Sequence, residues 1–200
     1  MRRIGVFGGT FNPPHIAHLI AAEEVRQQMN LEKILFIPSA NPPLKNNENL
    51  LPVNMRYDMT ALAIAGNKYF ELSDIEIKLA EYSPDTSSYT VNTLIALKKT
   101  YKASDFKLYL IIGMDQLAEL DKWYQPGKLF LLSEVIAVNK PGYTVKDVKN
   151  EFLNRVTLVP VRNIDISSSE LRNRVAEGKT IRYLVPYEVE KYIYENKLYQ

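Results

Sequence analysis

The sequence predicts an α/β fold in which a doubly wound parallel sheet is covered by helices on both faces. Short apolar runs rich in β-branched residues alternate with longer amphipathic stretches. This alternation is typical of strands buried in a parallel sheet and of the helices that connect them. The 200 residues, of which 46% are hydrophobic and 24% charged, are enough for one domain with a substantial core. We therefore expect a single domain over residues 1–200.

Six short runs are expected to form the strands, and most are apolar enough to be buried. They are residues 3–7, 33–38, 70–73, 106–112, 134–138 and 157–161. Six strands are a typical number for one sheet.

The stretches between these runs predict helices at residues 16–29, 53–65, 89–100, 145–155, 169–177 and 186–196. The first is the clearest, because its apolar residues, such as Ile16, Ile20 and Val25, recur at helical spacing and form one broad stripe. The last two helices predict a small helical part at the end of the domain, from about residue 165.

Two polar stretches are expected to be loops. Residues 39–52 contain three prolines and four asparagines, and long irregular loops of this kind often carry function. Residues 81–88 contain a proline, an aspartate and a Ser-Ser pair, which favour an exposed loop.

Composition excludes several classes of protein. The 25 basic and 23 acidic side chains leave a net charge of +2, too small for the basic field of a dedicated nucleic-acid binder. No apolar run approaches the roughly 18 residues of a membrane-spanning helix, and the first residues lack the apolar core of a signal peptide. The absence of cysteine excludes disulfides, thiolate metal clusters and a cysteine nucleophile. We expect no nucleic-acid or membrane partner and a cytoplasmic location.

The most informative segment is residues 8–18, where the first strand meets the first helix. Gly8 and Gly9 are expected to form a turn that lets backbone N–H groups approach a phosphate, next to the positive end of the helix. The spacing matches neither the dinucleotide fingerprint Gly-x-Gly-x-x-Gly nor the P-loop pattern. A different kind of phosphate site is therefore predicted.

His15 and His18 are the only histidines and stand three residues apart at the helix start, so both imidazoles can face one side of its first turn. A single histidine is more often a capping or packing residue. A zinc pair is a further alternative, but zinc needs more ligands than the neighbouring residues supply. The glycines beside the two histidines favour an anion site instead.

A second group of polar residues follows the last predicted strand. Ser167 and Glu170 have the spacing of a capping box, which by itself only starts a helix. Together with Ser168, Ser169 and Arg172 they also offer hydroxyls, backbone donors and a guanidinium group to an anion. Two phosphate sites on one sheet suggest a triphosphate.

Between these groups, Gly113 and Asp115 follow another strand. Asp115 can bind a ribose hydroxyl, help to hold a metal-bound phosphate, or cap the helix that follows. Trp123, the only tryptophan, can stack on a planar ring or fill the core. Composition leaves these alternatives open.

Over nearly its whole length the chain resembles the bacterial nicotinate mononucleotide adenylyltransferases of the nucleotidyltransferase superfamily. Residues 8–18 resemble the His-x-Gly-His signature of that superfamily, and residues 166–172 resemble its Ile-Ser-Ser-Thr-x-x-Arg signature. Residues 88–94, 113–124 and 181–193 narrow the resemblance to the pyridine-nucleotide branch. One departure is Ala17, where the signature has glycine, and its extra methyl predicts a tighter fit against the bound nucleotide.

The resemblance implies a Rossmann-like fold of the nucleotidylyltransferase type and a reaction in NAD biosynthesis. In that reaction the phosphate of nicotinate mononucleotide attacks the α-phosphate of ATP, giving nicotinate adenine dinucleotide and pyrophosphate. It also implies Mg²⁺ held chiefly by phosphate oxygens and water, with no dedicated protein cage and with Asp115 as the one carboxylate that could assist.

The resemblance also implies roles for individual residues. His15 and His18 are expected to be catalytic, because they hold the triphosphate and the transition state. ATP is expected to bind Gly8, Gly9, Thr10, Phe11, His15, His18, Gly113, Asp115, Ile166, Ser167, Ser168 and Arg172. Nicotinate mononucleotide is expected to bind Asn41, Lys45, Thr90, Trp123 and Tyr124. Lys45 has the alternative of an ordinary solvated surface lysine.

Two other functions remain open at this point. A sibling adenylyltransferase with another acceptor would share both histidines and the three serines but lack the pyridine-side stretches. A nucleotide sensor would bind ATP without turnover, with Ala17 as a sign of drift, although both histidines and Arg172 are retained. The sequence leaves open the oligomeric state, a homo-oligomer included, and the preference for nicotinate over nicotinamide. It also leaves open the preferred divalent ion and any loop closure.

Overall fold

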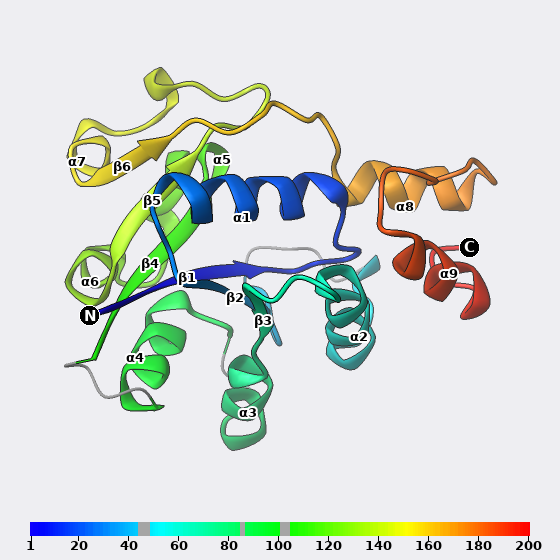
Figure 1. Ribbon diagram of the computed structural model, residues 1–200, viewed down its shortest axis with the longest axis horizontal. Helices are drawn as coiled ribbons and strands as arrows, with labels where there is room; N and C mark the ends of the chain where they lie inside the picture. Colours follow the sequence, from blue (N-terminus) through cyan, green and yellow to red (C-terminus); the bar gives the residue numbers. More distant parts are fainter. Residues whose placement is uncertain (44–48, 85–86, 101–104) are drawn as a thin grey trace.

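The computed structural model describes residues 1–43, 49–84, 87–100 and 105–200. Within these residues, parallel strands form one six-stranded sheet in the order β3-β2-β1-β4-β5-β6 (Figure 1). They are β1 (Arg2–Gly9), β2 (Lys33–Pro38), β3 (Phe70–Leu72), β4 (Phe106–Gly113), β5 (Glu134–Val138) and β6 (Val156–Val159). The predicted strands are confirmed, with ends that differ by at most two residues. The order reverses between β1 and β4, the point at which such sheets bind ligands.

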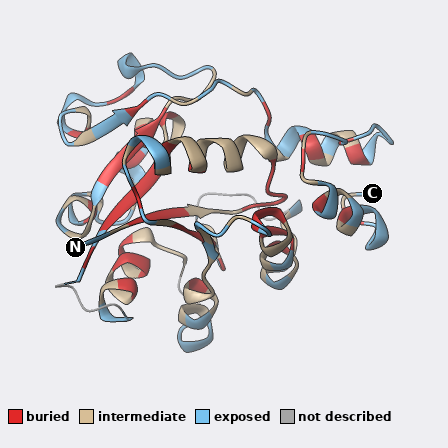
Figure 2. Ribbon diagram, in the orientation of Figure 1, coloured by how far each residue is buried: buried red, intermediate tan, exposed pale blue. Residues whose placement is uncertain are grey.

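Helices cover both faces of the sheet, which confirms the doubly wound arrangement. On one face, α1 (Ile16–Gln28) packs Ala22 and Val25 against the strands. The opposite face is covered by α4 (Thr90–Thr100), α5 (Met114–Ala118) and α6 (Pro126–Leu132). Figure 1 shows α1 and α4 on opposite sides of the sheet, and Figure 2 shows that much of the sheet between them is buried.

The C-terminal helices lie beyond the carboxyl ends of the central strands (Figure 1). α8 (Ser168–Ala176) and α9 (Tyr187–Glu195) pack with α2 (Val53–Ile64) in a separate apolar cluster. Its buried members are Met59, Ala63, Ile166, Leu171, Val175, Ile181, Val185, Val189, Ile193 and Leu198. We call these residues the C-terminal cluster. It places a helical layer directly over the end of the sheet where a ligand is expected.

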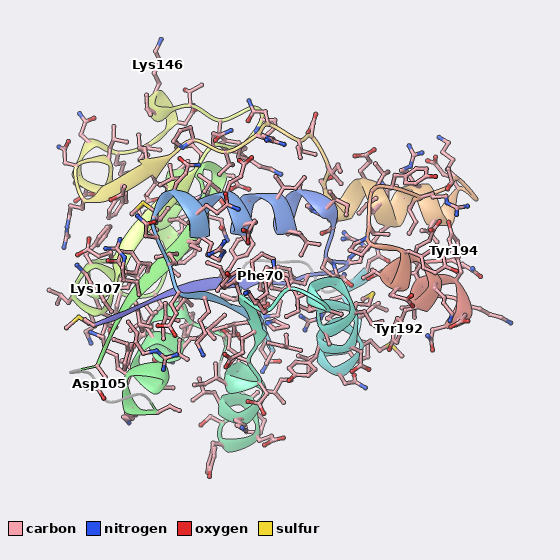
Figure 3. The ribbon with its side chains drawn as sticks, in the orientation of Figure 1. Phe70, Asp105, Lys107, Lys146, Tyr192 and Tyr194 are labelled. Atoms are coloured by element: carbon pink, nitrogen blue, oxygen red, sulfur yellow. The ribbon has the colours of Figure 1, made fainter. Side chains whose placement is uncertain are left out.

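A polar contact on the surface joins the same helices. Figure 3 shows Tyr192 and Tyr194 on α9. The Tyr192 hydroxyl donates to Oδ2 of Asp58 on α2, at 3.3 Å. Among the described residues, no helix combines the length and the apolar character needed to cross a membrane.

Five of the six predicted helices are confirmed with ends that differ by one residue, namely α1, α2, α4, α8 and α9. The sixth prediction, one helix over residues 145–155, is wrong. The structure has a 3₁₀ turn, η3 (Val145–Asp147), and a separate short helix, α7 (Asn150–Leu153). Between them Val148 is extended (φ −102°, ψ 137°), which lets its side chain reach the core.

Two helices and one turn were not predicted, and α5 was expected only in the alternative in which Asp115 caps it. α5, α6 and the 3₁₀ turn η2 (Leu120–Lys122) are too short to show a helical period. α3 (Ile75–Tyr82) reaches into the stretch that was expected to be a loop. Its buried residue is Glu76 rather than an apolar one, so it lacks the apolar stripe by which a helix is detected in a sequence.

Candidate active site

The glycines at the end of β1 remain in the strand, where Gly8 pairs with Ile37 and Gly9 with Pro38. They do not form the expected turn. The chain turns instead at Phe11, which is buried and has a left-handed backbone (φ 48°). The Phe11 ring lies so close to Gly9 that a Cβ there would come within 2.9 Å of it, whereas nothing lies within 4 Å of a Cβ added to Gly8. The strand end is therefore open beside Gly8.

The two histidines lie side by side at the start of α1. Their rings are stacked, with centroids 3.6 Å apart and an interplanar angle of 19°. The backbone N–H of His15 donates to Nδ1 of His18 at 3.2 Å, and the edge of the Phe11 ring contacts the His18 ring. Both imidazoles therefore face one side of the first turn, as the spacing predicted.

His15 is held in its neutral form. Burial chiefly, and the positive charge of Lys140 in addition, lower its pKa from 6.5 to about 3. Its Nδ1 is buried and has no hydrogen-bond partner among the described residues. A buried polar atom without a partner is uncommon in folded proteins and is found where a ligand completes the hydrogen bonding.

The start of α8 packs directly against the turn after β1. Ser167 caps the helix, because its Oγ accepts from the backbone N–H of Glu170 at 3.1 Å. The Ser168 hydroxyl donates to the Pro13 carbonyl at 2.8 Å, and Arg172 Nη1 donates to the Asn12 carbonyl at 2.9 Å. The two predicted anion-binding groups thus meet, although about 155 residues separate them.

Ile166 and Thr10, which were both predicted to bind ATP, lie in different surroundings. The Ile166 side chain is buried in the C-terminal cluster, so only its backbone could meet a ligand. Thr10 is half-buried, and its carbonyl accepts from Arg56 at 2.8 Å. Ala17 also packs against the C-terminal cluster, which gives its methyl group a structural contact.

Asn12 ties the turn to two other parts of the chain and was not predicted as a site residue. The Tyr199 hydroxyl donates to its Oδ1 at 2.7 Å, and its Nδ2 donates to the Asn49 carbonyl at 2.7 Å. The C-terminal residues therefore hold the turn from one side and the loop after β2 holds it from the other.

Gly113 ends β4, the strand next to β1. Its N–H donates to Oε1 of Gln116 at 3.0 Å, and the Asp115 carboxylate accepts from the Gln116 N–H at 2.9 Å. The N-cap of α5 is Gly113, so the interpretation of Asp115 as the cap is wrong. No group of three or more His, Asp or Glu side chains suited to a metal ion occurs in the described part of the chain.

The residues expected to bind the acceptor come together from separate segments. The Asn41 N–H donates to Ser88 Oγ at 2.9 Å, and the Ser88 N–H donates to the Asn41 carbonyl at 2.8 Å. Thr90, which begins α4, follows directly. The preceding Tyr89 ring stacks on Tyr124, with centroids 4.6 Å apart. Lys45 lies outside the described residues.

The position of Trp123 is compatible with both interpretations, stacking on a planar ring and filling the core. It ends the turn η2 and is half-buried against the core cluster on the α4 face, so part of the ring packs as a core residue does. The remaining part is accessible, and the neighbouring Tyr124 is exposed. Stacking on a ligand ring stays a prediction.

Sequence reasoning also missed Ser39 and Lys140, which follow β2 and β5. The Ser39 N–H donates to the Gly9 carbonyl at 2.9 Å and so joins the end of β2 to the end of β1. Its Oγ is buried without a hydrogen-bond partner among the described residues. Neither residue belongs to a recognisable pattern, although a serine or lysine within two residues of the end of a parallel strand could have been noted as a candidate.

Comparison with known proteins gives a consistent result. A family model described as cytidylyltransferase-like matches residues 6–174. A probable nicotinate-nucleotide adenylyltransferase of Desulfitobacterium hafniense is 40% identical over 206 residues, covering 100% of this chain and 96% of that protein. Proteins with the same name from Thermomicrobium roseum and Bacillus cereus (strain B4264) are each 38% identical, covering 100% of this chain and 92% and 100% of their own lengths.

A solved structure supports the fold assignment. The nicotinic acid mononucleotide adenylyltransferase of Plasmodium falciparum, complexed with NaAD, superposes with a TM-score of 0.80. The match covers 100% of this chain and 98% of that one, at 19% identity. At this identity the likeness concerns the fold.

Proposed function

This chain belongs to the cytidylyltransferase-like family, and we propose that it transfers the adenylyl group of ATP to nicotinate mononucleotide in NAD biosynthesis. The products are nicotinate adenine dinucleotide and pyrophosphate. The observation that carries the proposal is the meeting of the stacked histidines with Arg172 and Ser168 around one turn, at the point where the strand order reverses. Relatives aligned over the whole chain bear the name of this activity.

The reaction needs charge neutralisation more than it needs a base. The second pKa of a phosphate monoester is about 6, so the attacking phosphate is largely ionised at pH 7 without help from the protein. Its attack on the α-phosphate gathers negative charge from two phosphate groups and the departing pyrophosphate. Preorganised donors and positive charges around that point lower the barrier.

The proposed donors are His15, His18 and Arg172, each held by the fold. His15 is neutral in the free protein, and the charges of a bound triphosphate would favour its protonated form. The Arg172 guanidinium is fixed by the Asn12 carbonyl and the Ser169 hydroxyl. Lys140, whose charge acts on His15, adds to the positive potential.

The described residues suit a metal ion that arrives with the nucleotide. They contain no cluster of acidic ligands, and the Asp115 carboxylate already accepts a backbone hydrogen bond. Mg²⁺ bound to phosphate oxygens and water would neutralise part of the phosphate charge, with Asp115 as the carboxylate available to assist. The cytoplasmic location and the acceptor contacts of Asn41, Thr90, Trp123 and Tyr124 belong to the same proposal, as does the predicted contact of Lys45.

The test is pyrophosphate release by the purified protein with ATP and Mg²⁺, with each of three acceptors in turn. We expect rapid release with nicotinate mononucleotide and much slower release with nicotinamide mononucleotide or phosphopantetheine. Release with phosphopantetheine alone would assign the chain to a sibling activity. ATP binding without release from any acceptor would identify a sensor.

A further inference from the structure

A short segment after β2 is held from both sides by two buried charged residues. The Ala40 carbonyl accepts from Arg56 Nη2 at 3.3 Å, and the Ala40 N–H donates to Glu76 Oε2 at 3.3 Å. Arg56 is 1% exposed and Glu76 is 7% exposed. No sequence pattern marks either residue.

Glu76 connects this segment to α4. Its Oε1 accepts from the Thr93 hydroxyl at 2.8 Å, and the Ser88 hydroxyl also hydrogen-bonds to its carboxylate. The same Ser88 oxygen accepts from the Asn41 N–H. One buried carboxylate therefore holds Asn41 through Ser88, and it holds the first turns of α4, which begins at Thr90, through Thr93.

Arg56 connects the segment to the nucleotide side. Its Nη1 donates to the Thr10 carbonyl at 2.8 Å and its Nε to the Leu51 carbonyl at 2.9 Å. Because a guanidinium group is planar and rigid, these bonds and the one to Ala40 fix three loop segments relative to one another. Thr10 belongs to the turn that carries His15.

We propose that Arg56 and Glu76 are positioning residues. They bind the C=O and the N–H of Ala40 and so fix the position of the neighbouring Asn41 relative to the turn that carries His15. This inference rests on the proposed function. In-line attack requires the reacting phosphate groups to approach within about 3.5 Å in the correct orientation, so a loop shift of about 1 Å reduces the rate strongly. Arg56 acts through backbone carbonyls, and Glu76 acts through the Ala40 N–H and the hydroxyls of Thr93 and Ser88.

The energetics favour a positioning role over a purely stabilising one. Burial raises the pKa of Glu76 despite its hydrogen bonds and lowers that of Arg56 to about 10, so the fold disfavours both charges. Well-packed apolar residues at buried charged positions are often as stabilising or more so. The directional bonds of these two residues end on the loop segments beside the site and on the first turns of α4.

The first test compares Glu76→Ala with Glu76→Gln in the full chain. Alanine leaves the Ala40 N–H without an acceptor, whereas glutamine retains one carbonyl oxygen for it. We expect Glu76→Ala to raise KM for nicotinate mononucleotide about tenfold with less than about a twofold change in KM for ATP, and Glu76→Gln to recover most of the loss. If Glu76→Ala does not fold, Ser88→Ala, which removes only the hydroxyl bridge in a half-exposed loop, should raise the same KM about threefold.

Leu97→Ala is the matched control. It creates a cavity between α4 and the core and removes none of the hydrogen bonds to Ala40. It should lower Tm and leave both KM values unchanged. An unchanged acceptor KM in the Glu76 and Ser88 variants, or an equal rise in both KM values in Glu76→Ala and Leu97→Ala, would overturn the proposal.

Arg56→Lys tests the link between the two loops. A single ammonium group keeps the charge but cannot bond three carbonyls in a fixed plane. We expect kcat to fall about tenfold or more while KM for ATP stays within about twofold. An unchanged kcat would remove Arg56 from the proposal. A wild-type protein that releases no pyrophosphate with nicotinate mononucleotide would instead reject the proposed function, so the two failures are distinguishable.

Discussion

At the scale of single residues, burial keeps His15 neutral in the free protein, and this links the stability of the fold to pH. Its pKa of about 3 means that the folded chain binds a proton at this group only in strong acid, whereas the unfolded chain does so below 6.5. Because the unfolded state binds more protons in that window, His15 makes the free energy of unfolding fall as the pH falls from 6.5 toward 3.

This leads to a prediction for the NMR titration of His15. The ring signals of His15 should not titrate between pH 8 and 5 in the free protein. Addition of ATP should bring a titration into this range, because the phosphate charges favour the imidazolium form. An ordinary titration near pH 6.5 in the free protein would show that the ring is not buried as described.

Replacement of His18 by alanine should lower kcat far more than ATP affinity. Its predicted role lies in the transition state, and loss of one such donor typically costs about 100- to 1000-fold in kcat. Steady-state kinetics and calorimetric titration with ATP measure the two effects separately. A loss of ATP affinity as large as the loss of kcat would assign His18 to ground-state binding.

Replacement of Trp123 by alanine should mainly raise KM for nicotinate mononucleotide. Since the ring is half-buried against the core, Tm should also fall. The kinetic and thermal measurements separate the two roles. A lower Tm with an unchanged KM would make Trp123 a core residue only.

At the scale of elements, the first turn of α1 both carries the histidines and supports the C-terminal helices. Ala17, on the helix between the histidines, packs against the C-terminal cluster. The Ile16 N–H donates to the Leu184 carbonyl at 3.0 Å, which adds a backbone link. The methyl that was expected to tighten the nucleotide fit therefore has a packing role as well.

Ala17→Gly should consequently retain activity but reduce stability. Glycine inside a helix costs about 1 kcal/mol relative to alanine, and the lost methyl removes a contact with the cluster. Urea unfolding measures the stability change, and kcat/KM measures the activity. A large loss of activity at full folding would show that the methyl is part of the site.

The elements that could be predicted are those with a long, regular pattern. The strands have apolar runs because they are buried in the sheet, and α1 has an apolar stripe because one side of it packs on the sheet. α3 could not be predicted because its buried residue is a carboxylate, and residues 145–155 were misread because Val148 reaches the core from extended backbone. In both cases tertiary contacts override the local pattern.

At the scale of the whole molecule, the site depends on contacts that no local motif records. The two motifs that are predicted to bind anions can be recognised in the sequence because each is a short polar run after a strand. Ser168 and Arg172 bond to the turn after β1 because the C-terminal helices lie over the end of the sheet. No local motif predicts this packing. Arg56 and Glu76 act mainly through backbone groups, which leave no signature in sequence.

The candidate site is assembled from segments that are far apart in the chain. Strand order brings the ends of β1 and β4 together, and Ser39 joins the end of β2 to that of β1. The C-terminal residues then close the turn through the bond from Tyr199 to Asn12. Residues from both ends of the chain thus surround one point.

In the proposed reaction, the adenylyl group of ATP is transferred to the acceptor phosphate at that point. The most direct measurement follows ATP labelled on its α-phosphate, with nicotinate mononucleotide and Mg²⁺, through chromatography of the products. We predict that the label appears in nicotinate adenine dinucleotide, in equal amount to the unlabelled pyrophosphate released, and that none remains bound to the protein. Label that stays in ATP, or that is released as AMP without dinucleotide, would contradict the account.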